Sequence, residues 1–252
     1  MVAKDTVHLS VVIPAFEEAE RLGPTLRRIR AYLNEQLFSS EVLVVVDGGK
    51  DGTLALVRKL ENEWAELRVL HNESNCGKGF AIRRGMLVAR GRYLLFSDAD
   101  LSTPIEEVER LVAALEAGGD VAIGSRALTG SVVRVRQVWW REWMGRQFNR
   151  IVRLAALSAV RDTQCGFKCF RRSAARDIFA RQRIARFSFD VELLWIARQL
   201  GYRVAEVPVI WINDPSSRVH PLRDSLRMVV DLMRLRYNDL RGVYRPSDDL
   251  SD

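Results

Sequence analysis

Hydrophobic and polar positions alternate along the first half of the chain in a way that predicts a parallel sheet. Short apolar runs predict buried strands at His8–Ile13, Val42–Val46, Leu67–His71, Tyr93–Phe96 and Val121–Gly124. Amphipathic stretches between them predict helices at Glu17–Leu37, Thr53–Glu63, Gly77–Ala89 and Pro104–Ala117, the last with Thr103 as its N-cap. Because strands and helices alternate, we expect an α/β fold with a mostly parallel mixed sheet and helices on both faces. Ligands of such sheets bind beyond the carboxyl ends of the strands.

The second half of the chain is less regular. Its pattern predicts a Trp- and Arg-rich helix, a short strand, a helix, a longer strand and a basic amphipathic helix, at Val138–Leu157, Phe167–Phe170, Phe189–Leu200, Arg203–Ile212 and Leu222–Arg236. A turn at Asp162–Gly166 precedes the short strand. We therefore expect one catalytic domain over residues 1–237, with a ligand-binding half at 8–130, an acceptor half at 131–237 and a tail at 238–252.

Composition narrows the class of protein. The 252 residues are 48% hydrophobic and carry 39 basic against 32 acidic side chains, a net charge of +7, which favours acidic partners such as nucleotides, phosphates or an anionic membrane.

Three cysteines, an odd number with no CxxC pair, argue against a disulfide framework. No apolar run reaches the roughly 18 to 20 residues of a membrane span, and the N-terminus lacks the apolar run of a signal peptide. We expect a cytoplasmic protein that lies against a membrane if it meets one.

Two carboxylates follow the apolar run Tyr93–Phe96. Asp98 and Asp100 are separated by one residue, so both can approach one divalent cation. Mg²⁺ or Mn²⁺, which prefer oxygen ligands, would bridge them to a diphosphate. A solvated turn is the alternative, but carboxylates clustered at a sheet edge repel each other unless a cation joins them.

Two glycine-containing loops follow other predicted strands. In the loop Asp47–Thr53, a carboxylate can accept hydrogen bonds from a base or ribose, or Asp51 and Thr53 can simply cap the next helix. The loop Asn75–Gly79 opens a helix and does not match the Walker pattern, which excludes a P-loop ATPase. Lys78 at that helix start can neutralise a diphosphate.

Seven stretches, in chain order, resemble glycosyltransferase family 2 and within it the polyprenyl-phosphate glycosyltransferases. They are VVIPAFEEAERL (11–22), VVVDGGKDGT (44–53), NCGKGFAIRRGM (75–86), LLFSDADLSTP (94–104), IGSRA (123–127), DTQCGFKCFRR (162–172) and FDVELLWIA (189–197). The likeness covers residues 9–237. It implies a Rossmann-like GT-A fold, a Mg²⁺ or Mn²⁺ cofactor, and inverting transfer of a hexose from a nucleotide sugar to polyprenyl or dolichyl phosphate. Ser102, where the mannose synthases have Gln, shifts the likeness toward the glucosyltransferases. UDP-glucose is the preferred donor and GDP-mannose the alternative.

The resemblance also implies roles for individual residues. The donor nucleotide would be surrounded by Pro14, Ala15, Phe16, Glu18, Asp47, Lys78 and Asp98, and the metal ion held by the catalytic carboxylates Asp98 and Asp100. Phe16 keeps a ring where the family has Tyr, and Val46 replaces a second aspartate. The acceptor phosphate would be bound by Arg126, which also counts as catalytic, and by Arg141, Ser217 and Arg218. Arginine suits this task because its planar fork matches phosphate oxygens; a surface charge is the alternative for each.

Two basic amphipathic helices indicate contact with a membrane surface. The last predicted helix has Arg223, Arg227 and Arg234 beside its apolar stripe, and the helix around Trp139 and Trp143 combines aromatic and basic residues. Such helices lie among lipid headgroups. Packing on the domain itself, or on a second copy in a homodimer, is the alternative.

Three other functions fit part of the pattern. A family 2 enzyme with a soluble hydroxyl acceptor would need a base, for which Asp190 is the candidate, whereas a phosphate acceptor needs positioning rather than deprotonation. A nucleic-acid-binding protein would fit the pI near 9.7, but the basic residues are scattered and no reading motif occurs. A catalytically silent sugar-nucleotide binder is the third alternative.

Overall fold

The computed structural model describes residues 7–134, 160–186, 188–212 and 221–245. The helix predicted over Val138–Leu157 and three predicted acceptor-side residues, Arg141, Ser217 and Arg218, lie outside the described residues. Residues 246–252, which are part of the tail expected over 238–252, also lie outside the described residues.

A seven-stranded sheet forms the centre of the described structure, in the order β3-β2-β1-β4-β7-β5-β8. The strands are β1 (Leu9–Ala15), β2 (Ser40–Asp47), β3 (Leu67–Asn72), β4 (Tyr93–Ser97), β5 (Val121–Ser125), β7 (Phe167–Arg171) and β8 (Val204–Pro208). Neighbouring strands run parallel except where β7 pairs antiparallel with β4 and β5. The predicted mixed, mostly parallel sheet is confirmed.

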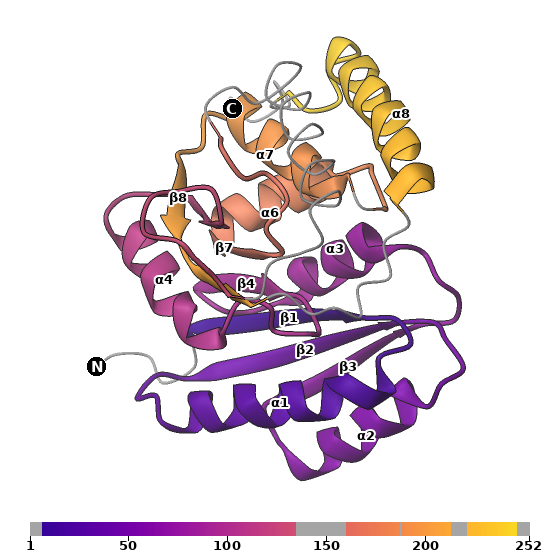
Figure 1. Cartoon of the computed structure of the whole chain (residues 1–252), viewed down its shortest axis with the longest axis vertical. Helices are drawn as coiled ribbons and strands as arrows, with labels where there is room; N and C mark the ends of the chain where they lie inside the picture. Colours follow the sequence, from indigo (N-terminus) through magenta and orange to yellow (C-terminus); the bar gives the residue numbers. More distant parts are fainter. Residues whose placement is uncertain (1–6, 135–159, 187, 213–220, 246–252) are drawn as a thin grey trace, which may run out of the picture.

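Helices cover both faces of the sheet (Figure 1). One face carries α1 (Ala19–Asn34), α2 (Thr53–Glu63) and α4 (Val108–Glu116), and the other carries α3 (Lys78–Val88), α6 (Arg172–Arg181) and α7 (Phe189–Gln199). Alternate residues of one strand serve the two cores: Val11 and Ile13 pack on the α1 side, and Val12 packs on the α3 side. Burial on both faces explains why the strands read as continuous apolar runs.

Strand β7 brings a turn from late in the chain to the carboxyl edge of the sheet. Its register pairs Phe167 with Ser97, the last residue of β4. Because β7 is antiparallel, its amino end lies where its neighbours have their carboxyl ends. The turn Asp162–Gly166, which directly precedes β7, therefore arrives beside the segments that follow β4 and β5.

The structure corrects two local predictions. The strand expected over Arg203–Ile212 is divided into β8 and β9 (Ile210–Ile212), and β9 pairs with β6 (Val132–Arg134) in a separate two-stranded sheet. The division follows Pro208, which has no N–H to continue a ladder. Thr103 does not cap α4: a 3₁₀ turn precedes that helix, and the Thr103 hydroxyl lies 4.0 Å from Sγ of Cys165 instead.

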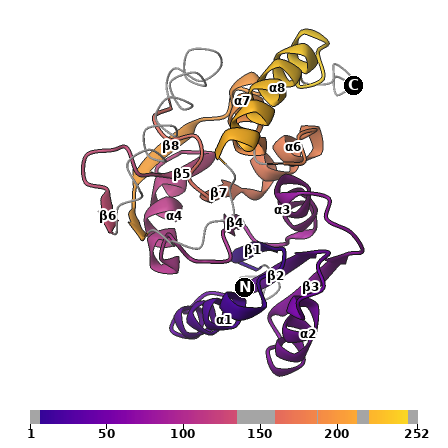
Figure 2. The same cartoon turned by 45° about the vertical axis from the view of Figure 1, so that its right-hand side comes forward.

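The C-terminal helix α8 (Pro221–Leu240) packs on α7 (Figure 2). Leu232 and Leu235 are buried in the α3-side core, and the guanidinium of Arg236 lies 4.7 Å from the ring centroid of Trp195. Beyond the helix, the Tyr244 hydroxyl donates to Glu192 at 2.6 Å. In the described part of the chain, no helix has both the length and the apolar character needed to cross a bilayer.

The close contact of α3 with the sheet depends on Gly85. A Cβ at this position would lie 2.4 Å from Cγ1 of Val12 and 3.0 Å from Cγ2 of Val45. We predict that Gly85→Ala lowers the free energy of unfolding by about 1–3 kcal/mol, because the added methyl forces the helix away from a close-packed surface. Urea denaturation measures the change.

Gly23→Ala is the matched control. Gly23 is also helical, but its Cβ would come no closer than 3.6 Å to any neighbour, so this variant should be neutral or slightly stabilising. Equal stabilities for the two variants would contradict the assigned packing.

Candidate active site at the carboxyl edge of the sheet

The carboxyl ends of β1, β2 and β4 bring the first three sequence motifs together. These strands are adjacent and parallel, with Ala15 beside Val46 and Val12 beside Phe96. The residues that follow them, at 16–18, 48–53 and 98–100, therefore share one edge of the sheet. This is the edge at which ligands of parallel sheets bind.

Lys78 and Asp98 form an ion pair at this edge. Lys78 is the first residue of α3, and its Nζ lies 2.6 Å from Oδ1 of Asp98. Burial alone would lower the pKa of Lys78, but the carboxylates of Asp98, Asp190 and Asp100 raise it above its ordinary value. Lys78 therefore carries its positive charge among three acidic groups, in a position to meet an anionic ligand.

Asp100 lies next to this pair, in surroundings that disfavour its charged form. Burial and the charge of Asp98 raise the pKa of Asp100, although the Ser102 N–H donates to its Oδ1 at 2.9 Å. In the parts of the chain that the structure describes, no cluster of three or more His, Cys, Asp or Glu side chains could enclose a metal ion. Two carboxylates that repel each other fit instead a hard divalent cation that takes its other ligands from a phosphate and water.

Gly166 lies directly against Asp98. A Cβ on Gly166 would come within 2.1 Å of Oδ2 of Asp98 and 2.6 Å of its carboxyl carbon. Only glycine leaves room for the carboxylate here. The turn before β7 therefore forms one wall around the Asp98 side chain.

Asp47 holds the loop that leads into α3. It is 2% exposed, and its carboxylate accepts hydrogen bonds from Nδ2 of Asn72 at 2.6 Å and from the N–H groups of Cys76 and Gly77 at 3.1 and 2.7 Å. These bonds place the start of α3, and with it Lys78. The predicted contact of Asp47 with a nucleoside stays a prediction.

The segment after β1 is tied to the segment after β2. Asp51 accepts the N–H groups of Ala19 at 3.0 Å and Thr53 at 3.1 Å, the first residues of α1 and α2. The Thr53 hydroxyl in turn accepts the N–H of Glu18 at 2.9 Å. Asp51 thus binds an N–H group at the start of α2, the helix that follows it, whereas Thr53 is the first residue of that helix and binds the segment before α1 instead.

Four residues predicted to surround the nucleotide lie at the end of β1 or directly after it, and their exposure differs. Ala15 is buried and Pro14 is partly buried, both within β1, whereas the Phe16 ring is 37% exposed at the edge of the sheet. The Glu18 carboxylate pairs with Arg21. Of these four side chains, the Phe16 ring is the most exposed.

Arg126 is held by a buried carboxylate that the sequence did not single out. Its Nε and Nη2 donate to the two oxygens of Asp162 at 2.7 and 2.9 Å, and its backbone N–H donates to Oδ2 at 2.9 Å. Burial would raise the pKa of Asp162, but Arg126 holds it at about 2. Asp98 also acts electrostatically on Arg126, so the two predicted sites lie within reach of each other.

A second buried ion pair lies beneath the site. Lys168 is fully buried, pairs with Asp190 and donates to the carbonyl of Cys165 at 2.6 Å. Burial raises the pKa of Asp190, against the opposing charges of Lys168 and Lys78. Glu192, two residues after Asp190 in α7, is also engaged, because its carboxylate accepts the N–H groups of Arg183 and Ile184.

The described part of the site brings together most of the predicted residues and adds some that were missed. Asp47, Lys78, Asp98, Asp100 and Arg126 all follow, or lie beside, the carboxyl ends of strands. Asp162 and Gly166 were recognised only as part of a family motif. The signal that could have found them is an acid and a glycine in the turn that enters an antiparallel strand.

The contact between Gly166 and Asp98 generates a prediction. Gly166→Ala should displace the Asp98 carboxylate and weaken Mn²⁺ binding about tenfold or more, measured with uridine diphosphate present by electron paramagnetic resonance of the free ion. The unfolding temperature should change little, because the clash is with the end of a side chain. The same Gly23→Ala control should bind Mn²⁺ as the unchanged chain does. Unaltered Mn²⁺ affinity in Gly166→Ala would show that Asp98 is not a ligand.

Comparison with known proteins agrees with this geometry. A family model described as "Glycosyl transferase family 2" matches residues 10–179. The dolichyl-phosphate beta-glucosyltransferase of Drosophila melanogaster is 37% identical over 253 residues, covering 95% of this chain and 78% of that protein. The enzyme of the same name from Dictyostelium discoideum is 35% identical, covering 96% and 77%.

Among solved structures, glucosyl-3-phosphoglycerate synthase from Mycobacterium tuberculosis, in complex with Mn²⁺, UDP-glucose and phosphoglyceric acid, aligns with a TM-score of 0.65. The alignment covers 96% of this chain and 82% of that one, at 20% identity, and it confirms the GT-A fold. With a family model that spans most of the chain and relatives 35% and 37% identical along nearly all of it, this chain belongs to glycosyltransferase family 2.

Proposed function

We propose that this glycosyltransferase transfers a hexose, by preference glucose, from a nucleotide sugar to polyprenyl or dolichyl phosphate with inversion at the anomeric carbon. The observation that carries the proposal is the grouping of Lys78, Asp98 and Asp100 at the carboxyl edge of the sheet, within electrostatic reach of Arg126. It provides binding groups for two phosphate-bearing substrates. The names of the two relatives supply the substrate class.

The donor side needs groups that offset the charge of a leaving nucleoside diphosphate. Lys78 is kept cationic by its acidic neighbours and begins a helix, whose N-terminus also favours an anion. Asp98 and Asp100 would hold Mg²⁺ or Mn²⁺, which supplies Lewis-acid stabilisation of the diphosphate when bound. Phe16, with its exposed ring, is proposed to stack on the base of the nucleotide, and Pro14, Ala15, Glu18 and Asp47 to shape that pocket.

The acceptor side needs a group that orients a phosphate. Arg126 offers a guanidinium whose plane is held by Asp162. A phosphate monoester, with a second pKa near 6, is already largely dianionic at neutral pH. It attacks the anomeric carbon without a base, so orientation is the main contribution that the protein makes. Arg141, Ser217 and Arg218 are proposed as further ligands of this phosphate.

The buried pair of Asp190 with Lys168 favours a phosphate acceptor over a soluble hydroxyl compound. A general base must reach the proton that it removes, but Asp190 is 5% exposed and is engaged by a fully buried lysine. Asp190 instead supports the floor of the site.

The first test is transfer of labelled sugar to polyprenyl phosphate in detergent, from UDP-glucose and from GDP-mannose. We predict transfer from UDP-glucose that requires Mg²⁺ or Mn²⁺ and is abolished by EDTA. Asp100→Ala should lower the rate by about two orders of magnitude or more, because charge on the leaving diphosphate is no longer offset. Labelled lipid is counted after solvent extraction.

Asp120→Ala is the matched control for loss of a carboxylate. Asp120 directly precedes β5 at the opposite edge of the sheet and accepts the N–H of Arg203, so its loss should leave the rate close to that of the unchanged chain. Label in lipid from GDP-mannose alone would reassign the sugar. Donor binding without transfer to any lipid phosphate would refute the acceptor.

The outward face of α8 supports contact with a membrane at its cytoplasmic face. While Leu232 and Leu235 are buried, a second apolar stripe faces solvent, with exposures of 59% for Val230, 68% for Met233, 58% for Tyr237 and 84% for Leu240. These positions recur every three to four residues, and the exposed Arg234 and Arg241 flank them. A stripe of this kind inserts among headgroups, with its arginines near anionic lipid. All three cysteines are unpaired, which suits a reducing compartment.

Met233→Glu should weaken binding to vesicles of phosphatidylcholine and phosphatidylglycerol about tenfold or more, because a buried methionine contributes about 1.5–3 kcal/mol. Co-sedimentation measures the bound fraction. Leu37→Glu, at an equally apolar and fully exposed position after α1, is the control and should bind as the unchanged chain does. If Met233→Glu instead converts a dimer to a monomer, the stripe is an interface between two copies.

A further inference from the structure

The turn Asp162–Gly166 contacts both halves of the proposed site. At its end, Gly166 borders the Asp98 carboxylate. At its start, Asp162 binds Arg126 through both carboxylate oxygens. One five-residue turn therefore sets the position of a donor-side and an acceptor-side group, and the question is what Asp162 contributes to the reaction.

Asp162 fixes the orientation of the Arg126 guanidinium. Two of the five N–H bonds of that group are used by the carboxylate, and Cζ of the guanidinium lies over the ring of Trp211, 5.2 Å from the ring centroid. The other three N–H bonds have no hydrogen-bond partner among the described residues. One of these bonds on Nη1 and one on Nη2 form a second edge of the planar group, suited to two phosphate oxygens.

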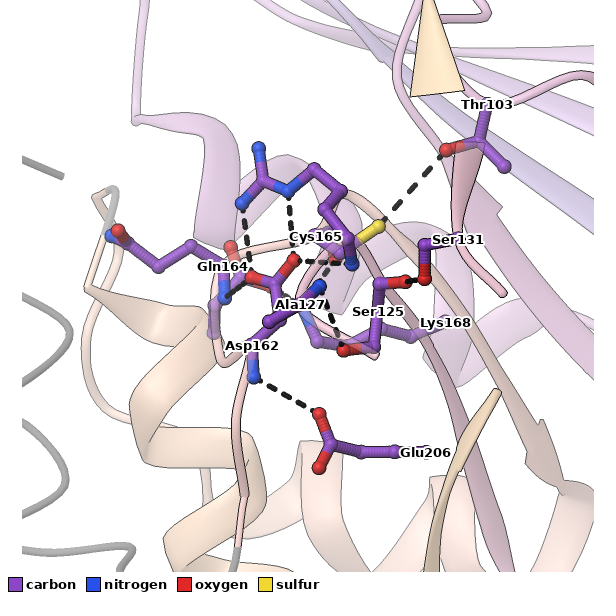
Figure 3. Close-up of polar contacts among 11 residues, drawn as sticks. Thr103, Ser125, Ala127, Ser131, Asp162, Gln164, Cys165, Lys168 and Glu206 are labelled. Carbon is purple, nitrogen blue, oxygen red and sulfur yellow. Dashed lines mark hydrogen bonds and ion pairs between the residues drawn. The ribbon is translucent and has the colours of Figure 1, made fainter. Parts of the chain in front are cut away.

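Asp162 is itself held by a residue on a neighbouring strand. The carboxylate of Glu206 accepts the N–H of Asp162 at 3.0 Å (Figure 3). Its other oxygen accepts the N–H of Arg161 at 2.9 Å. Glu206 lies in β8, where it pairs with Ile123 of β5, and Arg126 directly follows β5. The three residues are thus supported by two paired strands, which restrict their relative movement.

The charge of Asp162 works against simple attraction of an anion. The Asp162 carboxylate, bound to one edge of the guanidinium, offsets much of the positive charge of Arg126, so an arginine selected for charge alone would bind phosphate better without it. Its burial also costs free energy that the pair must offset. Orientation is the benefit that accounts for this arrangement.

We propose that Asp162 and Glu206 are positioning residues that hold the Arg126 guanidinium in the orientation that binds the acceptor phosphate for attack. This inference rests on the proposed function, in which Arg126 binds that phosphate. The acceptor class to which it applies is a phosphate monoester, since that is the group whose oxygens match the remaining N–H edge of Arg126.

Asp162→Asn separates orientation from charge, because it keeps the shape of the side chain and removes one negative charge. If charge alone matters, the variant attracts the acceptor more strongly and KM for polyprenyl phosphate falls. Orientation predicts the opposite: a loss of kcat/KM for the acceptor of about tenfold or more, with KM for UDP-glucose unchanged. Glu63→Gln, which removes the same charge from the exposed end of α2, is the control and should change neither value.

A double-mutant cycle tests whether Asp162 acts through Arg126. Arg126→Lys keeps the positive charge and loses the planar fork. If the proposal is right, Asp162→Asn has little further effect in the Arg126→Lys chain, because the group that it positions is gone. Glu206→Gln, which retains one acceptor oxygen, should reduce kcat/KM for the acceptor in the same direction and by less. Thermal unfolding of each variant verifies that it is folded. If Asp162→Asn does not fold, Glu206→Gln replaces it in the test.

The proposal is overturned by a lower KM for the acceptor in Asp162→Asn, by additive losses in the cycle, or by a change confined to KM for UDP-glucose. Each requires that the unchanged chain transfers sugar to polyprenyl phosphate. Absence of that transfer overturns the proposed function, and the positioning role with it. Normal transfer by both the unchanged chain and Asp162→Asn overturns the positioning role alone.

Discussion

The antiparallel insertion of β7 between β4 and β5 is the constraint on which the site depends. It pairs Phe167 with Ser97, so the turn before β7 enters at the edge where the parallel strands end. An additional parallel strand would have placed that turn at the far edge of the sheet. Gly166 could then not border Asp98, and Asp162 could not bind Arg126. The mixed sheet thus supplies the site with one more contributing segment.

The charged side chains at this edge form three pairs, each of a basic and an acidic residue. Lys78 pairs with Asp98, Arg126 with Asp162, and Lys168 with Asp190, the last beneath the other two. Each buried charge is expensive unless a partner offsets it, so the pairs fix the side chains in place before any ligand binds. Asp100 stands apart, because burial, and then the charge of its neighbour Asp98, raise its pKa. A divalent cation would relieve that repulsion, and this gives the candidate metal site its physical basis.

Helix α7 connects the proposed active site with α8, the helix that is proposed to contact a membrane. Glu192, in α7, is fully buried and accepts hydrogen bonds from the N–H of Ile184 and from the hydroxyl of Tyr244. The same helix carries Asp190, which supports the floor of the site. These contacts would keep the site at a set distance from the membrane surface that α8 is proposed to contact.

Sequence by itself determined the strands, most helices and the grouping of Asp47, Lys78, Asp98 and Arg126, because buried parallel strands are continuous apolar runs and their carboxyl ends share one edge. Only the tertiary structure decided the partners of these residues. Asp162 lies 36 positions from Arg126, and no periodicity in the chain reports which strand β7 joins or in which direction. Pro208 is visible in the sequence as the place of a break, but the pairing of β8 with β5 and of β9 with β6 is not. Pairings between distant segments come from the packing of whole elements, so local patterns carry no record of them.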